Sequence, residues 1–234
     1  MAEEQATKVR LTLANRKVSD AGLALGLKPG DMLLAVNGRA FSEGVRSLNQ
    51  RFAVARGRNL VLTFQRGTAV FMVLARTPAL GAWVEEEGEP QFDGERQDPE
   101  MLTNWDILIN EKGEYDLFPR KPSILAIACP PLWMLQARLW APMAAITAAI
   151  VVAGLIWLPL GAVVWALAGL LLRHSGAQMV RADRLSLGME PSAIVAAMNE
   201  TQAHESYRLL NPEARFMFAP KMVEKENAED ETPA

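Results

Sequence analysis

The chain has 234 residues, 50% of them hydrophobic, and a formal net charge of −3, averages that by themselves assign no class of protein. Its charges are unevenly placed, because Arg138 is the one charged residue between Pro122 and Leu172. This distribution excludes a single soluble domain that would span the whole chain, and the lone Cys129 excludes an internal disulfide bond. The sequence therefore predicts a folded head, a membrane segment and a tail.

The first predicted unit is an α+β head over residues 8–76. Pro29-Gly30 and Asn37-Gly38 are turn signals on either side of a short apolar strand, Met32–Val36. A helix is expected next, with Ser42 as its cap and one apolar face formed by Val45, Leu48, Phe52 and Ala55. Two more strands are expected at Leu60–Gln65 and Ala69–Leu74.

The stretch from Ala21 to Gly38 resembles the centre of bacterial PDZ domains, which reads as a small residue, Gly-Leu, Lys-Pro-Gly-Asp, an apolar strand and Asn-Gly. The resemblance implies a fold in which a partner's extended tail adds to a sheet as an extra strand. Here the usual first half is abbreviated to Val9–Ala14 and a short link, and no glycine-rich carboxylate loop is recognisable. Another small α/β domain with an ordinary Pro-Gly-Asp turn is the alternative.

The head is basic, with twelve Lys or Arg against five Asp or Glu in residues 1–76, a balance of +7. We expect some of its arginines to contact anionic lipid or an acidic partner, with scattered surface charge as the alternative. Aromatic residues are not interleaved with them, so nucleic acid is not an expected partner. The arginines concerned are Arg39, Arg46, Arg51, Arg56 and Arg58.

Residues 77–103 are predicted to be a flexible acidic linker, because Glu85–Glu100 holds eight acidic residues together with prolines and glycines. Residues 104–121 form a predicted β-hairpin lead, in which Trp105–Ile109 and Glu114–Phe118 alternate apolar with polar residues. Residues 122–138 are apolar but contain Pro130-Pro131, which predicts an interfacial or re-entrant segment. If this segment crosses the membrane instead, head and tail fall on opposite sides.

Residues 139–174 are predicted to be a transmembrane helical hairpin. The apolar run is too long for one straight crossing, and Pro159 marks the reversal between helices at Ala141–Leu158 and Pro159–Arg173. A pair of buried helices in a soluble core is the alternative. Small residues at four-residue spacing are expected to pack the hairpin against itself and against partner helices: Ala145, Ala149, Ala153, Ala162 and Ala166.

The charges that flank the hairpin predict that head and tail both lie in the cytoplasm. The flanking cations are Arg120, Lys121 and Arg138 before the hairpin and Arg173, Arg181 and Arg184 after it. The resemblance to bacterial domains implies a bacterial inner membrane. The stretch from Trp105 to Leu187, with its PPLW and ARLW elements, also resembles an uncharacterised family of small bacterial membrane proteins. That second resemblance implies an architecture and no chemistry.

Residues 175–212 are predicted to form a juxtamembrane helix at Gln178–Leu187 and a longer helix at Glu190–Leu210, ahead of a disordered tail at residues 213–234. His174 lies at a helix end and His204 is expected to be solvated. Neither belongs to a recognisable catalytic or metal motif, and we expect no enzyme activity, metal or cofactor.

The expected function is a non-catalytic accessory or scaffold subunit of a membrane complex, with membrane lipid and other integral membrane subunits as partners. The alternative is a membrane-tethered adaptor that binds extended peptide tails for an enzyme acting in trans.

Overall fold

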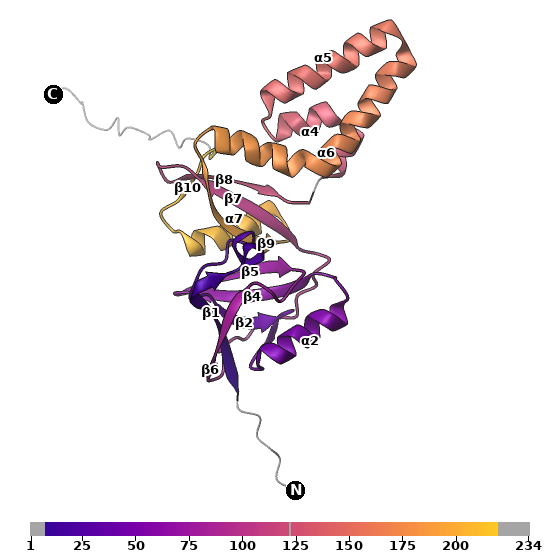
Figure 1. The fold of residues 1–234 in the computed structure, drawn as a ribbon. Helices are drawn as coiled ribbons and strands as arrows, with labels where there is room; N and C mark the ends of the chain where they lie inside the picture. Colours follow the sequence, from indigo (N-terminus) through magenta and orange to yellow (C-terminus); the bar gives the residue numbers. More distant parts are fainter. Residues whose placement is uncertain (1–7, 122, 220–234) are drawn as a thin grey trace, which may run out of the picture.

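The protein has a mixed α+β fold, and the computed structural model describes residues 8–121 and 123–219. Two β-sheets lie next to each other, and a group of helices projects from the second sheet (Figure 1). The described residues thus form a two-sheet body at one end and a helical projection at the other.

The first sheet contains six strands in the order β5-β4-β2-β1-β6, with β3 paired to β2. Their bounds are β1 Val9–Val18, β2 Met32–Val36, β3 Arg39–Ala40, β4 Leu60–Arg66, β5 Ala69–Ala75 and β6 Gly81–Glu87. The strands predicted at residues 32–36, 60–65 and 69–74 are confirmed, the last two with one more residue each. The short α1 (Asp20–Leu23) is capped by Ser19, whose side chain accepts a hydrogen bond from Gly22 N.

Helix α2 (Val45–Ala55) covers this sheet and buries Leu48 and Phe52, as predicted. The predicted cap at Ser42 is wrong, because the helix begins after Gly44 and the Ser42 carbonyl accepts from Val9 N in β1. The free N–H of Val45 instead donates to Glu85 Oε1 at 2.7 Å. A carboxylate from β6 therefore occupies the helix N-terminus, where a negative charge is favourable.

The acidic segment after residue 80 is not a flexible linker throughout, and that prediction is wrong for its first part. β6 pairs with β1 along Val9–Leu13, and the Trp83 ring stacks on Phe64 with centroids 6.3 Å apart. Packing of alternate residues keeps the strand in place while its glutamates face solvent. Farther along, Gln97 N donates to the Asn37 carbonyl, so residues 88–100 contact the body although they lack regular structure.

The second sheet has the order β10-β8-β7-β9. Its strands are β7 Thr103–Ile109, β8 Glu114–Pro119, β9 Glu190–Ala197 and β10 Arg215–Phe216. The predicted hairpin is confirmed as the antiparallel pair β7 and β8. The helix predicted from Glu190 is wrong in its first half, because this alanine-rich stretch pairs with β7 as β9 and is buried there.

The remaining part of that predicted helix is α7 (Glu200–Leu210), which Asn199 caps through a bond from Gln202 N to its side chain. Of the predicted disordered tail, residues 220–234 lie outside the described residues. Residues 215–216 form β10, which pairs in parallel with β8, so this part of the tail is ordered.

The two sheets share one hydrophobic core, so the head is not a separate module on a tether. Asn104 of β7 behaves like an extra backbone unit beside β5, since its amide donates to the Leu74 carbonyl and its carbonyl accepts from Leu74 N, each at 2.9 Å. Gly26 lies against β9, where a side-chain Cβ would stand 2.9 Å from Ile194 N. The head and the second sheet therefore pack as one body.

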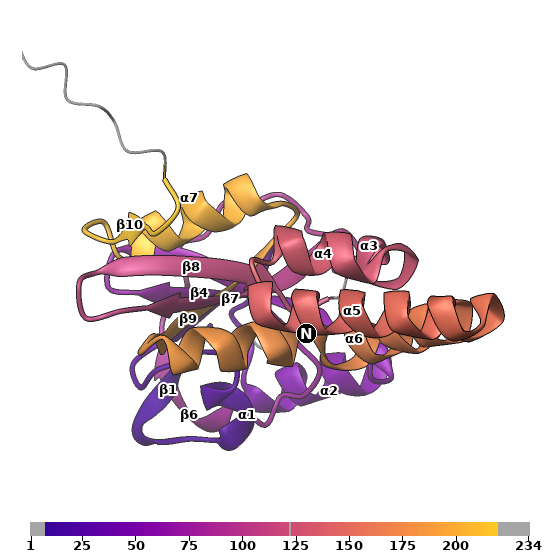
Figure 2. The ribbon, with the colours of Figure 1, turned by 90° about the horizontal axis from the view of Figure 1, so that it is seen from above.

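Four helices are inserted between β8 and β9. They are α3 (Ile124–Ala128), α4 (Pro130–Gln136), α5 (Trp140–Ile156) and α6 (Leu158–Ser186). Helices α5 and α6 form a hairpin that extends away from the sheets, with α3 and α4 beside its lower half (Figures 1 and 2). Because β8 and β9 both pair with β7, the chain leaves and re-enters the same sheet.

The break between α5 and α6 lies at Trp157, in extended conformation, two residues before the predicted reversal at Pro159. Proline is at the start of α6, where it removes a donor that would be unpaired in any case. Helix α6 does not end at Arg173 but continues to Ser186, and the separately predicted helix at Gln178–Leu187 is its last part. The apolar segment 122–138, which was predicted to be interfacial or re-entrant, contains α3 and α4, and the two helices are separated at Cys129.

Candidate functional site

The most unusual surface of the molecule is the tip of the α5–α6 hairpin. Leu155, Ile156, Trp157 and Leu158 are 82%, 73%, 64% and 80% exposed. More exposed apolar side chains continue down both helices, including Val151, Val152, Val163, Leu167, Leu170 and Leu171. Soluble proteins rarely leave so continuous an apolar surface uncovered.

By length and composition α6 is the one described helix that is long and apolar enough to cross a membrane, and α5 is a shorter apolar helix. Core helices of a soluble protein pass the same test, but those are mostly buried. Here the apolar part of α6 is largely exposed. Residues 8–121 and 123–219 do not cover the hairpin, which favours an external cover over the alternative of a soluble core.

The helices of the projection approach one another at glycines of α6. A Cβ at Gly161 would lie 2.9 Å from Gly154 Cα in α5, and one at Gly169 would lie 2.6 Å from the Ile127 carbonyl oxygen in α3. A Cβ at Gly176 would lie 2.9 Å from the Trp133 ring in α4. Sequence analysis did not single out these three glycines, although their spacing of eight and seven residues places them on one helical face.

The predicted alanine set plays a smaller part in this packing. Ala153 is buried, but the other four members are exposed: Ala145, Ala149, Ala162 and Ala166. The exposed alanines leave shallow surfaces on both helices. Their contact with partner helices stays a prediction.

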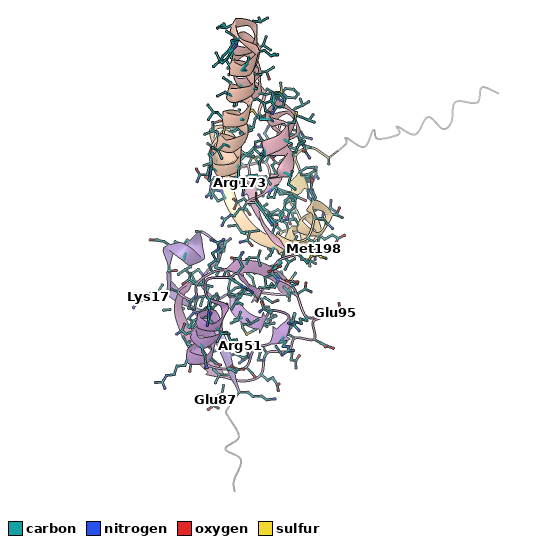
Figure 3. The ribbon with its side chains drawn as sticks, turned by 90° about the vertical axis from the view of Figure 1, so that its right-hand side faces the viewer. Lys17, Arg51, Glu87, Glu95, Arg173 and Met198 are labelled. Carbon is teal, nitrogen blue, oxygen red and sulfur yellow. The ribbon has the colours of Figure 1, made fainter. Side chains whose placement is uncertain are left out.

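The predicted arginine set lies on and around α2, at the opposite end of the molecule from the hairpin (Figures 1 and 3). Arg39, Arg46, Arg56 and Arg58 are exposed. Arg51 contacts Glu43 at 2.6 Å and lies 4.9 Å from the Phe41 ring centroid. The hydrogen bond from Ser47, and then Arg51, hold the pKa of Glu43 below its ordinary value. Contact of this set with anionic lipid or an acidic partner stays a prediction, with scattered surface charge as the alternative.

A different group of cations lies where the hairpin meets the second sheet. Arg184 of α6 is 4% exposed, and its Nε donates to Asp116 Oδ2 of β8 at 2.6 Å. Its other nitrogens donate to Asp183 and to the Ala137 carbonyl. These bonds tie α6 to β8 and to the end of α4, and they satisfy a buried charge.

Beside Arg184 is a cavity of about 340 Å³, which Lys121, Gln136, Arg138 and Phe218 also line. The guanidinium carbon of Arg138 lies 3.3 Å from the centroid of the Phe218 ring. Over residues 8–121 and 123–219, neither Lys121 nor Arg138 forms an ion pair. We call this cavity the base pocket. Its lining includes Asp116, Lys121, Trp133, Gln136, Arg138, Arg184, Glu200 and Phe218.

His204 is not solvated as expected, because its Nδ1 is hydrogen-bonded to the Tyr115 hydroxyl at 2.8 Å and its side chain is 17% exposed. Burial lowers the pKa of His204 and raises the pKa of Tyr115. Ser192 bonds the Tyr207 hydroxyl at 2.8 Å, on the neighbouring ring. Because Ser192 contacts Tyr207 instead of His204, these groups do not form a nucleophile–base pair. Their evident role is to hold β8, β9 and α7 together.

Within the described ranges, no three His, Cys, Asp or Glu side chains gather as a metal site would require. The comparisons with known proteins found nothing similar: no protein-family model, no curated protein and no solved structure matches the chain. The resemblances to PDZ domains and to the small bacterial membrane proteins therefore remain predictions. The site that the geometry itself supplies is the apolar hairpin with the base pocket beneath it.

Proposed function

We propose that this chain is a membrane-anchored accessory or scaffold subunit without catalytic activity, located at the bacterial cytoplasmic membrane. The observation that carries the proposal is the exposed apolar tip, where four consecutive large side chains, Leu155–Leu158, are left uncovered by the part of the chain that the structure describes. Transfer of one such side chain out of water contributes about 1.5–3 kcal/mol. A lipid bilayer supplies a cover of the required chemistry.

The topology of the insertion supports a hairpin that enters from one side. Both ends of the excursion belong to one sheet, so the sheets, head and tail stay together on the side of entry. Helix α5 is about 26 Å long, and α6 is about 22 Å long from Leu158 to Leu172. The hydrocarbon core of a bilayer is about 30 Å thick, so the hairpin reaches through most of it.

The cations at the base agree with this orientation. Arg173 lies where the hairpin joins the body (Figure 3), Lys121 and Arg138 line the base pocket, and Arg181 follows Arg173 in α6. Basic residues gather on the cytoplasmic side of membrane helices and are attracted to anionic lipid there. This supports a cytoplasmic position of the two-sheet body.

The accessory role rests on a small-residue surface of the hairpin that other described elements leave exposed. Ala145 and Ala149 form an exposed small-residue face on α5, which a helix of another membrane subunit can approach closely. The body then holds the head at a fixed distance from the membrane, because the head and the second sheet share a core. A rigid spacer of this kind suits a subunit that positions a partner.

Native mass measurement of the full chain, extracted from its own membranes in mild detergent, tests this role. We expect a complex with another membrane protein, and we expect the pair Ala145→Leu and Ala149→Leu to release that partner by steric conflict. Thr147→Leu adds similar bulk to an exposed position on another face of α5 and is the matched control. A lone monomer from native membranes, or equal release by the control, would contradict the accessory role.

One observation favours the adaptor as a second candidate. β6 is an edge strand of the first sheet and lies beside the N-terminus of α2. An open edge accepts an added peptide strand. Because Glu85 already occupies the helix N-terminus, a peptide's terminal carboxylate would be repelled there, and internal or basic extended segments are the expected ligands. A library of extended peptides offered to the full-length protein tests the adaptor, and absence of binding removes it.

A further inference from the structure

The base pocket lies between three elements that the fold fixes relative to one another. β8 forms its floor through Asp116, α6 contributes Arg184, and the end of α4 contributes Gln136 and Arg138. The buried ion pair between Asp116 and Arg184 locks this arrangement. A cavity of about 340 Å³ has room for a small polar group such as a phosphate.

The charge balance of this pocket favours an anion. Arg184 is paired with Asp116 and also with Asp183, which does not line the pocket. One further acid lines it, Glu200, whose carboxylate lies 3.7 Å from His204 Nε2. The lining residues thus hold three cations and two acids, a net charge of +1. Among residues 8–121 and 123–219, no ion pair involves Lys121 or Arg138.

The cap of α4 fixes the position of Arg138 at the pocket. Arg138 has φ +58, and it ends α4 with hydrogen bonds from its own N–H to Leu135 O and from Leu139 N to Met134 O. Glycine is the usual residue for this left-handed cap, and a residue with a Cβ is strained there. The chain nevertheless has an arginine at this position, where its side chain stacks on Phe218 at the pocket. Arg56 ends α2 in the same left-handed conformation, so the positive φ belongs to the helix cap, and it is the contact with Phe218 that holds the Arg138 guanidinium at the pocket.

The pocket also lies at the height where headgroups would be. It is at the foot of the apolar hairpin, and Trp133, an amphipathic side chain suited to the interface, lines it. Resting on the proposed membrane anchoring, we infer that the base pocket binds the phosphate of an anionic headgroup through Lys121 and Arg138. The shared chemistry is a phosphate anion, and the proposed source is a lipid of the leaflet that the hairpin enters.

The test uses the full-length protein in neutral detergent with phosphatidylglycerol added, and native mass measurement counts bound lipid. We expect one retained lipid, with affinity reduced about tenfold or more in Arg138→Gly and in Lys121→Gln, because each change removes a charge-assisted hydrogen bond. Arg138→Gly also relieves the backbone strain, so its thermal stability should not fall. Arg173→Gln is the matched control, since Arg173 is exposed near the base but does not line the pocket.

A second arm adds inorganic phosphate as a competitor. Displacement of the lipid by inorganic phosphate supports a phosphate site. Tight binding of inorganic phosphate without retained lipid would overturn the lipid source. An equal loss of lipid in Arg173→Gln and Arg138→Gly would overturn the pocket, because the attraction would then be diffuse. Insertion into phosphatidylcholine vesicles is measured separately: normal insertion without a retained anionic lipid contradicts this inference alone, whereas no insertion contradicts the proposed anchoring itself.

Discussion

Arg184 of α6 donates a hydrogen bond from Nε to Asp116 Oδ2 of β8 at 2.6 Å, and this pair joins the helical projection to the two-sheet body. Both side chains are nearly buried, with exposures of 5% and 8%. The foot of the hairpin is therefore fixed by a charge pair that water hardly screens. This connection makes the orientation of the body depend on the orientation of the hairpin.

Replacement of Arg184 by methionine should destabilise the protein by about 3–5 kcal/mol, because Asp116 is left as an unpaired buried charge. The double change Arg184→Met with Asp116→Asn should recover much of this loss. Urea unfolding followed by tryptophan fluorescence measures both. Arg181→Met, which removes a cation without a described ion pair, is the control, and an equal effect of the two arginine changes would contradict the assignment.

Gly161→Ala and Gly154→Ala should change stability in opposite directions. A Cβ at Gly161 meets the facing helix at 2.9 Å, and such overpacking typically costs about 1–3 kcal/mol. A Cβ at Gly154 has open space, so alanine there should add up to about 1 kcal/mol through helix propensity. Thermal unfolding in detergent compares the two variants, and a stabilising Gly161→Ala would show that α5 and α6 do not cross at this residue.

Asn104→Ala should weaken the contact between the two sheets by about 1–3 kcal/mol, since it removes two hydrogen bonds to Leu74 that each contribute about 0.5–1.5 kcal/mol. The free energy of unfolding in urea is the measurement. Asn49→Ala on the exposed face of α2 should have almost no effect. If the two variants behave alike, the sheets are not coupled through Asn104.

The free energy of unfolding should decrease as the pH is lowered, because His204 has a lowered pKa in the folded protein. Its pKa in the folded protein lies below the ordinary value of 6.5, because burial disfavours the charged ring more strongly than Glu200 favours it. The unfolded chain therefore takes up a proton first, so this stability is fully present above pH 6.5 and is lost as the pH falls below it toward the folded pKa. In His204→Gln this part of the pH dependence should disappear from unfolding curves. Its persistence in the variant would assign the effect to another group.

Local patterns in the sequence predicted local structure well. Strands β2, β4 and β5 and the β7–β8 pair were predicted from turn residues, such as Pro29-Gly30 and Asn37-Gly38, and from stretches with period-two alternation. These signals work because each strand depends mainly on residues close to it in sequence. The apolar, uncharged run likewise predicted two helices, although the extended residue is Trp157 and not Pro159.

Features that depend on distant residues could not be predicted in this way. The sequence of β6 is acidic and predicts a linker, and that of β9 is rich in alanine and predicts a helix. Both segments are strands because β6 pairs with β1 and β9 pairs with β7. The base pocket joins Lys121, Arg138 and Arg184, which are far apart in sequence and show no motif. Gly161, Gly169 and Gly176 of α6 could have been recognised from the sequence, because their spacing puts them on one helical face. Four of the five predicted packing alanines are instead exposed.

The central claim is that lipid covers the hairpin, and flotation of the full-length protein with phosphatidylcholine vesicles tests it most directly. We predict that the wild-type protein floats with the vesicles, and that Leu155→Asp with Leu158→Asp stays in the aqueous fraction. A charged side chain costs about 2.5–3.5 kcal/mol at the centre of a membrane, and these two must pass that centre for the hairpin to insert. The control Leu23→Asp with Val54→Asp alters two residues that are also exposed, 58% and 75%, but lie on the body, and it should float like the wild type. A wild-type protein that remains soluble without detergent, or a tip variant that floats as well as the control, would contradict the account.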